Sequence, residues 1–175
     1  KALKLEISIL DYVRKHLRSL AGDLVMPFIS ALGSGGFIWI CAIAAFLYTE
    51  RYRMTGISMA ISLLMGLVVG SALLKPLFGR ARPFAKKPGI NLIVRAPRDS
   101  SFPSGHTLTS FAAATSLFLA ERELGSAALV LAALIAFSRI YLYVHYPSDV
   151  LAGAVLGMGL GYMGYKMVDT WGFSF

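Results

Sequence analysis

Long apolar segments separated by short polar ones dominate the sequence. Five of them approach or reach the roughly 20 residues with which an α-helix crosses the hydrocarbon core of a bilayer. They lie at residues 36–50, 54–76, 105–121, 124–142 and 149–168. The pattern predicts an all-α fold, namely a polytopic transmembrane helix bundle with about five full spans.

The first 35 residues follow a different pattern. Charged and apolar positions alternate through residues 1–19, which predicts an N-terminal amphipathic helix lying in the membrane interface. The next apolar segment, 24–32, is too short to span, contains Pro27 and ends in the glycine-rich stretch 33–36. We expect this second segment to form a partly inserted or buried half-helix.

Composition also points to a membrane protein. The 175 residues are 57% hydrophobic and 15% charged. Soluble domains average about 45–50% apolar residues and about 25% charged residues. Disorder is excluded as well, because it requires low hydrophobicity and high charge. We expect one membrane domain over residues 1–175, with an amphipathic and half-helix segment at 1–35 and a transmembrane catalytic core at 36–168.

Basic residues are concentrated in one polar connection. The chain has 17 Lys and Arg residues against 9 Asp and Glu residues, a formal net charge of +8. Residues 75–99 contain seven of the basic residues and a single acid, Asp99. Such a segment indicates an anionic partner. Because it lies between two long apolar segments, we expect a phosphate at a membrane surface among lipids, and no nucleic acid.

The predicted spans bring the polar motifs to one face of the membrane. The connections at 77–104 and 142–149 are separated by two spans, so they lie on the same side. Ionisable residues at the ends of spans are costly and are usually functional. The side chains that converge in this way are Lys75, Arg82, Ser104, His106, Arg139, His145 and Asp149.

Five of these residues suit a phosphate-binding site. Phosphoryl transfer needs positive charge around the equatorial oxygens, which Lys75, Arg82 and Arg139 can supply. Ser104 and Gly105 open a predicted helix, whose free N–H groups and dipole favour an anion. Gly105 lets the backbone approach the phosphate closely, and Ser104 adds a hydroxyl donor.

The histidines divide the chemistry between them. Asp149 follows His145 by one helical turn, so its carboxylate can bond one ring nitrogen and leave the other free to attack phosphorus. His145 is therefore the predicted nucleophile, with a phosphohistidine intermediate. His106, beside the anion site, is the predicted general acid for the leaving oxygen and then the base for water.

A metal site is the competing interpretation. Two histidines and one aspartate could form a facial triad for a metal ion. Three cations in the same place would repel a divalent ion. We therefore expect no metal and no other cofactor.

The three motifs resemble those of a known family. They read Lys-x6-Arg-Pro at 75–83, Pro-Ser-Gly-His at 103–106 and Ser-Arg-x5-His-x3-Asp at 138–149. Together they resemble the type 2 phosphatidic acid phosphatase (PAP2) superfamily, which also includes vanadium haloperoxidases and bacterial acid phosphatases. The resemblance covers 75–149 and implies a metal-independent lipid phosphatase whose motif residues have the roles given above.

The number of spans differs from that of many small bacterial members, which look like six-span proteins. Here five full spans are counted, with an amphipathic segment where a first span would end. Either a further N-terminal span is missing from this sequence, or this subgroup lacks it.

The substrate should be amphipathic. By resemblance the candidates are undecaprenyl diphosphate, phosphatidylglycerol phosphate and phosphatidic acid. The additional cations Arg80, Lys86 and Lys87 favour the diphosphate, although they could equally bind anionic headgroups.

Membrane sidedness is not decided by charge. Outside the basic connection, five basic residues lie on the catalytic face and four on the other. The resemblance implies the plasma membrane with the active site on the outer face.

Two other classes of function stay open. One is a non-enzymatic transporter or lipid carrier that uses the basic connection as an anion gate. Transporters usually show repeat symmetry and paired interrupted helices, and neither is visible here. The other is a haloperoxidase, but those relatives are soluble.

Overall fold

The computed structural model describes residues 2–87 and 89–170, and every regular element in those ranges is helical. The α-helices are α1 (Ala2–His16), α2 (Leu20–Leu32), α3 (Phe37–Tyr48), α4 (Arg53–Leu67), α5 (Lys75–Phe78), α6 (Gly105–Ala120), α7 (Arg122–Tyr141) and α8 (Pro147–Thr170). A π-helical stretch, Val68–Leu74, joins α4 to α5. The predicted all-α fold is confirmed.

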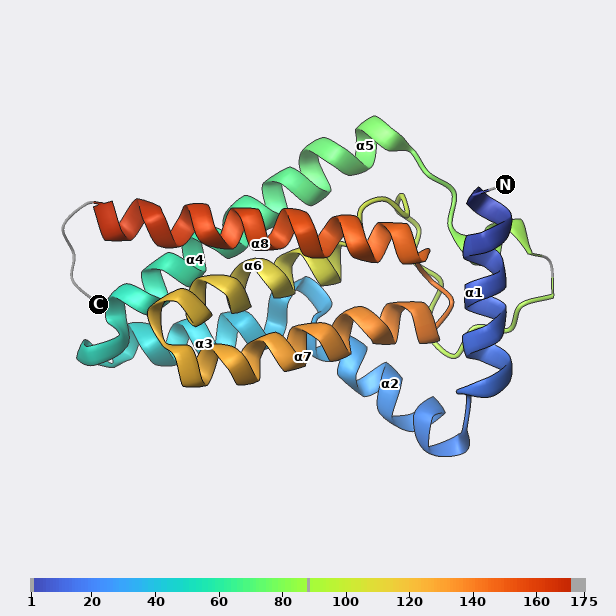
Figure 1. The fold of residues 1–175 in the computed structure, drawn as a ribbon, viewed down its shortest axis with the longest axis horizontal. Coiled ribbons are helices and arrows are strands. Elements are labelled where there is room, and N and C mark those ends of the chain that lie inside the picture. The colour runs from blue at the N-terminus through green and yellow to red at the C-terminus, as the bar shows by residue number, and fades with distance from the viewer. Residues whose placement is uncertain (1, 88, 171–175) are drawn as a thin grey trace.

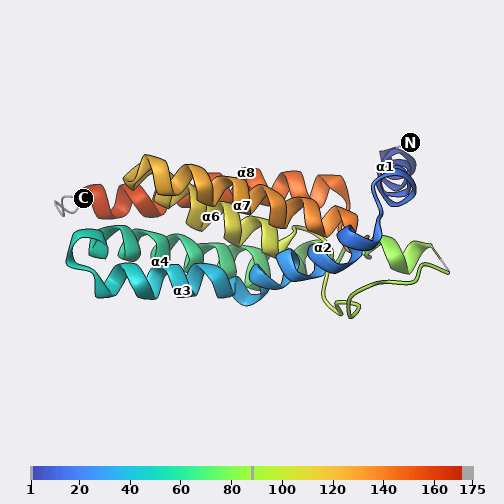
Figure 2. The same cartoon turned by 90° about the horizontal axis from the view of Figure 1, so that it is seen from below.

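The helices form an elongated bundle with α6 in its interior. Helices α3, α4, α6, α7 and α8 run along the long axis, and α6 packs against α4, α7 and α8 (Figures 1 and 2). Helix α1 lies across one end of this bundle (Figure 1). The connection between α5 and α6 runs at the same end, so polar segments distant in sequence meet there.

Small side chains allow the inner helices to approach closely. Ala112 and Ala113 of α6 are fully buried, and the core around them includes Trp39 and Ile135 from neighbouring helices. Trp39 Nε1 donates a hydrogen bond of 2.9 Å to Ser110 Oγ, which satisfies both polar groups inside the bundle. The core therefore links α3 to α6 and α7.

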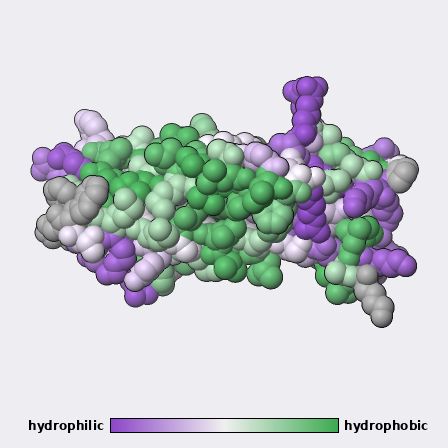
Figure 3. Space-filling model, turned by 90° about the horizontal axis from the view of Figure 1, so that it is seen from above, coloured by the Kyte–Doolittle hydropathy of each residue, from purple (hydrophilic) through white to green (hydrophobic). Residues whose placement is uncertain are grey.

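The surface has the pattern of a membrane protein. Apolar residues form a broad band over the middle of the bundle, with hydrophilic residues gathered toward both ends (Figure 3). Two segments are long and apolar enough to cross a membrane, Glu50–Lys86 and Arg122–Tyr141. A third qualifies if the bent pair Leu20–Leu32 and Ser34–Tyr48 counts as one span.

The expected count of five full spans is not confirmed and stays a prediction. Helix α6 has 16 residues, and α8 has 24 residues with several glycines. Both contribute serine, threonine or glycine to helix contacts inside the bundle, which lowers their hydropathy.

The segment 24–32, expected to be a half-helix, belongs to a longer helix than the sequence indicated. Helix α2 already begins at Leu20 and continues past Pro27 to Leu32. It then meets the following helix at a bend of 50°. Gly35 and Gly36 have φ values of 59° and 76°, which glycine adopts without the cost that a Cβ would add. The segment is thus the first part of a bent helical pair.

The N-terminal amphipathic helix forms as predicted, and part of its apolar face contacts protein. Leu10 of α1 is fully buried with Tyr143 and Tyr146, and Val13 packs in a cluster with Val144. These partners belong to the connection between α7 and α8. Helix α1 therefore covers that connection; its place in a membrane interface stays a prediction.

Glycines of α8 permit its contact with α6. A Cβ added at Gly157 would lie 2.5 Å from the Leu108 carbonyl oxygen, and one at Gly161 would lie 2.5 Å from the Ala112 carbonyl oxygen. Atoms cannot approach so closely without a backbone shift. The glycines at this spacing therefore serve helix packing.

Gly161→Ala should destabilise the bundle by about 1–3 kcal/mol through overpacking. Its apparent unfolding temperature in detergent should fall by about 2–4 °C per kcal/mol. The matched control is Gly159→Ala, because nothing lies within 4 Å of a Cβ at that position. Equal unfolding temperatures for the two variants would show that the α6–α8 contact does not require glycine.

Candidate active site

The three motifs meet at the end of the bundle that α1 covers. Lys75 begins α5, and Ser104 precedes α6. Arg139 lies in the last turn of α7, and Asp149 lies in the first turn of α8. His145 belongs to the short connection between those two helices and is 1% exposed. The structure thus brings together residues from four helix ends.

The hydrogen bonds of His145 define its tautomer. Nδ1 lies 2.8 Å from the Ser101 carbonyl oxygen, and Nε2 lies 3.1 Å from Arg82 Nη1. A carbonyl can only accept and a guanidinium can only donate. The ring proton is therefore on Nδ1, and the lone pair on Nε2 faces Arg82.

Asp149 supports His145 less directly than the sequence suggested. Its Oδ2 lies 3.5 Å from His145 Nδ1. The fully buried carboxylate also accepts from Tyr146 N at 2.9 Å, Ser101 Oγ at 2.5 Å and Arg80 Nη1 at 2.5 Å. The Ser101 carbonyl is thus the closest support for the ring, and Asp149 anchors the groups around it.

The environment of His145 favours its neutral form. Burial lowers the pKa of the imidazole, and the nearby charges of Arg82 and Arg139 lower it further. The carboxylate of Asp149 opposes this effect without reversing it. A neutral imidazole keeps the Nε2 lone pair available for attack on an electrophile.

Two predicted phosphate ligands are paired with a carboxylate. Asp99 Oδ1 accepts from Arg82 Nη2 at 2.8 Å, and its other oxygen accepts from Lys75 Nζ. Burial opposes ionisation of Asp99, but Lys75 and Arg82 together lower its pKa to about 2. Asp99 is half exposed. Its carboxylate therefore occupies an anion position between two cations of the site.

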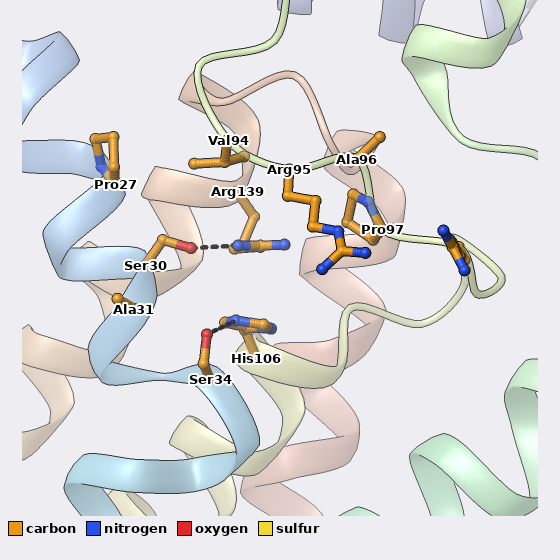
Figure 4. Close-up of a pocket in the computed structure, with 11 residues that line it drawn as sticks. Pro27, Ser30, Ala31, Ser34, Val94, Arg95, Ala96, Pro97, His106 and Arg139 are labelled. Carbon is orange, nitrogen blue, oxygen red and sulfur yellow. Dashed lines mark hydrogen bonds between the residues drawn. The ribbon is translucent and has the colours of Figure 1, made fainter.

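His106 and Arg139 lie on the other side of the site, against the bent helical pair (Figure 4). His106 Nε2 lies 3.2 Å from Ser34 Oγ. Arg139 Nη1 donates to Ser30 Oγ, whereas its buried Nε has no hydrogen-bond partner among the described residues. Arg139 thus keeps a donor free beside His106.

The glycine-rich stretch 33–36 gives His106 its place. A Cβ at Gly33 would lie 2.8 Å from an Ile135 methyl carbon and 3.2 Å from the His106 ring. Only glycine lets the chain pass this closely while Ser34 reaches the ring. The tertiary contacts thus connect this stretch with the site.

Ser104 caps α6 in this structure. Its hydroxyl is fully buried, pairs with Thr107 Oγ1 at 2.8 Å and accepts from Thr107 N at 3.5 Å. A Cβ at Gly105 would lie 3.5 Å from Lys75 Nζ, so bare backbone faces that ammonium group. The predicted roles of Ser104 and Gly105 in phosphate binding stay predictions.

Two of the three additional cations bind acids of α1. Arg80 Nη2 lies 2.6 Å from Glu6 Oε2, and Lys87 Nζ lies 2.6 Å from both oxygens of Asp11. The third of these cations, Lys86, has no ion pair within the described part of the chain. The argument for a diphosphate from these residues is therefore weakened, because Arg80 and Lys87 hold α1 in place.

The structure also identifies contacts that sequence reasoning missed, from Glu6, Ser30, Ser34, Asp99 and Ser101. None belongs to the three motifs. For Asp99 and Ser101, closeness in sequence to the second motif was the one signal that could have identified them. In residues 2–87 and 89–170, no three His, Cys, Asp or Glu side chains are grouped to hold a metal ion.

The sequence matches the PAP2 superfamily over residues 52–173. That range includes more than half of the chain, so the chain belongs to the PAP2 superfamily. Curated proteins similar to this chain include named phosphatases. Membership of the superfamily and of its phosphatase class, predicted from the motifs, is confirmed.

Two curated relatives and one solved structure illustrate the match. The undecaprenyl-diphosphatase of Sulfolobus acidocaldarius is 33% identical over 147 residues, covering 83% of this chain and 70% of that protein. The bacitracin transport permease protein BcrC of Bacillus licheniformis is 38% identical over 139 residues, covering 79% of this chain and 60% of that protein. The crystal structure of a transmembrane PAP2 type phosphatidylglycerolphosphate phosphatase from Bacillus subtilis has the same fold. Its TM-score is 0.81 at 24% identity, over 99% of this chain and 89% of that one.

Neutralising Asp99 should strengthen anion binding, because its carboxylate occupies two cations of the site. Asp99→Asn should lower the inhibition constant of vanadate by about three- to tenfold, the range expected for partly exposed ion pairs. Phosphate-release assays at graded vanadate concentrations would measure this constant. Asp169→Asn, which removes an exposed carboxylate paired with Lys166 near the other end of α8, is the control. Unchanged or weaker inhibition of Asp99→Asn would contradict competition by Asp99.

Proposed function

We propose that this protein hydrolyses a phosphate monoester or diphosphate of a lipid through a phosphohistidine on His145, without a metal ion. The observation that carries the proposal is the tautomer of His145. Its Nδ1 donates its proton to the Ser101 carbonyl, and its Nε2 lone pair faces the guanidinium of Arg82, a group that binds oxyanions. A histidine held in this way is a nucleophile ready for a phosphorus atom.

Binding begins with an exchange of anions. The substrate phosphate replaces the Asp99 carboxylate on Lys75 and Arg82, and Arg139 contacts it through the donor that is free at Nε. Helix α6 begins beside Lys75, and the free N–H groups of a helix N-terminus favour negative charge. These groups stabilise the equatorial oxygens in the transition state.

The chemical steps then follow from the two histidines. His145 Nε2 forms a bond to phosphorus as the bond to the leaving oxygen breaks, and His106 donates a proton to that oxygen. His106 next accepts a proton from water, which attacks the phosphohistidine. The P–N bond breaks, inorganic phosphate leaves, and His145 regains its lone pair.

Undecaprenyl diphosphate is the favoured substrate. A relative named undecaprenyl-diphosphatase matches 83% of this chain. Phosphatidylglycerol phosphate and phosphatidic acid are the other lipid phosphates considered, and a solved structure of the same fold carries the first of these in its name. The site lies at the end of the bundle, where a phosphate can bind while its tail stays in the apolar band.

The activity test uses purified protein in detergent with EDTA present. Phosphate release from lipid phosphates should continue with EDTA and be inhibited by vanadate. His145→Ala should lower kcat by about 10³-fold or more, because removal of a nucleophile abolishes the covalent route. His16→Ala is the matched control, since His16 is exposed and, among the described residues, contacts Tyr12 of its own helix.

A ³²P-labelled lipid phosphate should also label the wild type covalently after acid-free quenching, but not His145→Ala. Absence of hydrolysis of any lipid phosphate would overturn the proposal. It would favour the alternative, a transporter or lipid carrier, for which the permease name of one relative is the specific support.

We further propose that the protein resides in the plasma membrane with this site on the outer face. Single cysteines at the exposed positions Lys86 and Arg53, in a Cys41→Ser background, report the two ends of the bundle. A membrane-impermeant maleimide should label Lys86→Cys in intact cells and Arg53→Cys only after lysis. The reverse labelling would place the site in the cytoplasm.

A further inference from the structure

A cavity beside the reaction site is not accounted for by a single phosphate. It has a volume of about 460 Å³ and lies between α2 and the connection that precedes α6. His106 and Arg139 form one wall, and Arg95 and Arg98 contribute two more basic side chains. Figure 4 shows Arg95 extending from the connection into the space that Arg139 and His106 face.

The two additional arginines differ from most of the motif and neighbouring cations at this end of the bundle. Lys75, Arg80, Arg82 and Lys87 are all paired with carboxylates. Arg95 and Arg98 are exposed and make no hydrogen bond or ion pair with any residue that the structure describes. The cavity thus collects positive charge for which the described part of the chain supplies no counter-charge.

Arg139 also lines this cavity and has a buried donor without a partner in the described part of the chain. Arg139 is 5% exposed and lines the cavity, yet its Nε has no partner among residues 2–87 and 89–170. A buried polar group normally has a hydrogen-bond partner. An anion at the border between the cavity and the reaction site would provide it.

We infer that this cavity binds the inner phosphate of a lipid diphosphate while the terminal phosphate is held at His145. The inference rests on the proposed function and assigns residues to the second phosphate of its favoured substrate. Arg95 and Arg98 bind the inner phosphate with charge-assisted hydrogen bonds. Pro27 and Ala31 of α2 and Val94 give the cavity an apolar side against which the lipid tail begins.

The inner phosphate is then the leaving group. His145 Nε2 bonds to the terminal phosphorus, and the bond from that phosphorus to the bridging oxygen breaks. The electron pair stays on the bridging oxygen, which becomes a terminal oxygen of the lipid monophosphate. Arg95 and Arg98 stabilise this new negative charge, and water later releases the terminal phosphate from His145.

Protonation by His106 matters less in this reaction. A phosphate oxygen leaves more readily as an anion than an alkoxide does, so it needs less help from a general acid. His106→Ala should therefore reduce hydrolysis of a lipid monophosphate more than hydrolysis of the corresponding diphosphate.

The test compares farnesyl diphosphate with farnesyl monophosphate, which share one tail. For Arg95→Gln/Arg98→Gln, kcat/KM for the diphosphate should fall by about tenfold or more, the loss expected for charge-assisted hydrogen bonds. The value for the monophosphate should change by less than about twofold, which also shows that the variant is folded. Arg53→Gln, at the opposite end of the bundle, is the matched control.

Each outcome separates this inference from the proposed function. If the ratio of kcat/KM for the diphosphate to kcat/KM for the monophosphate is unchanged in the variant, the subsite is overturned. This holds whether both values fall together or neither falls. An equal fall for both that appears only with anionic lipid in the detergent micelle would assign the arginines to headgroup binding. If the wild type hydrolyses neither substrate nor any other lipid phosphate, the proposed function itself is overturned.

Discussion

Compensation of clustered positive charge organises one end of this molecule. Arg82 and Arg139 are each 5% exposed, and a buried cation without a partner costs several kcal/mol. Asp99 compensates Arg82, while Arg139 bonds to Ser30 and Arg80 lies against Asp149. These pairs determine where the chain runs between α5 and α6, and with it the position of the anion site.

The same pairs connect the N-terminal helix with the chemistry. Glu6 binds Arg80, and Arg80 binds the carboxylate of Asp149, which in turn accepts a hydrogen bond from Ser101. The carbonyl of Ser101 holds His145. A helix outside the three motifs is thus connected with the histidine through two ion pairs and two hydrogen bonds, so α1 belongs to the support of the site.

Helix packing supplies the precision that these contacts need. The interior helix α6 carries His106 in its first turn, and glycines of α8 let the two backbones approach closely. Gly33 allows a similar approach between α2 and α7 beside His106. Because the reacting groups stand at helix ends, small residues deeper in the bundle control their separation.

The sequence by itself determined the all-α membrane fold, the superfamily and the meeting of its three motifs at one end. Those properties follow from hydropathy, the spacing of motif residues and the direction of successive helices. The bend after α2, the Ser101 carbonyl on His145, the pairing of Asp99 and the unpaired Arg95 were decided by the tertiary structure. These contacts join residues far apart in the chain or lie in a connection without periodicity, so no local pattern encodes them.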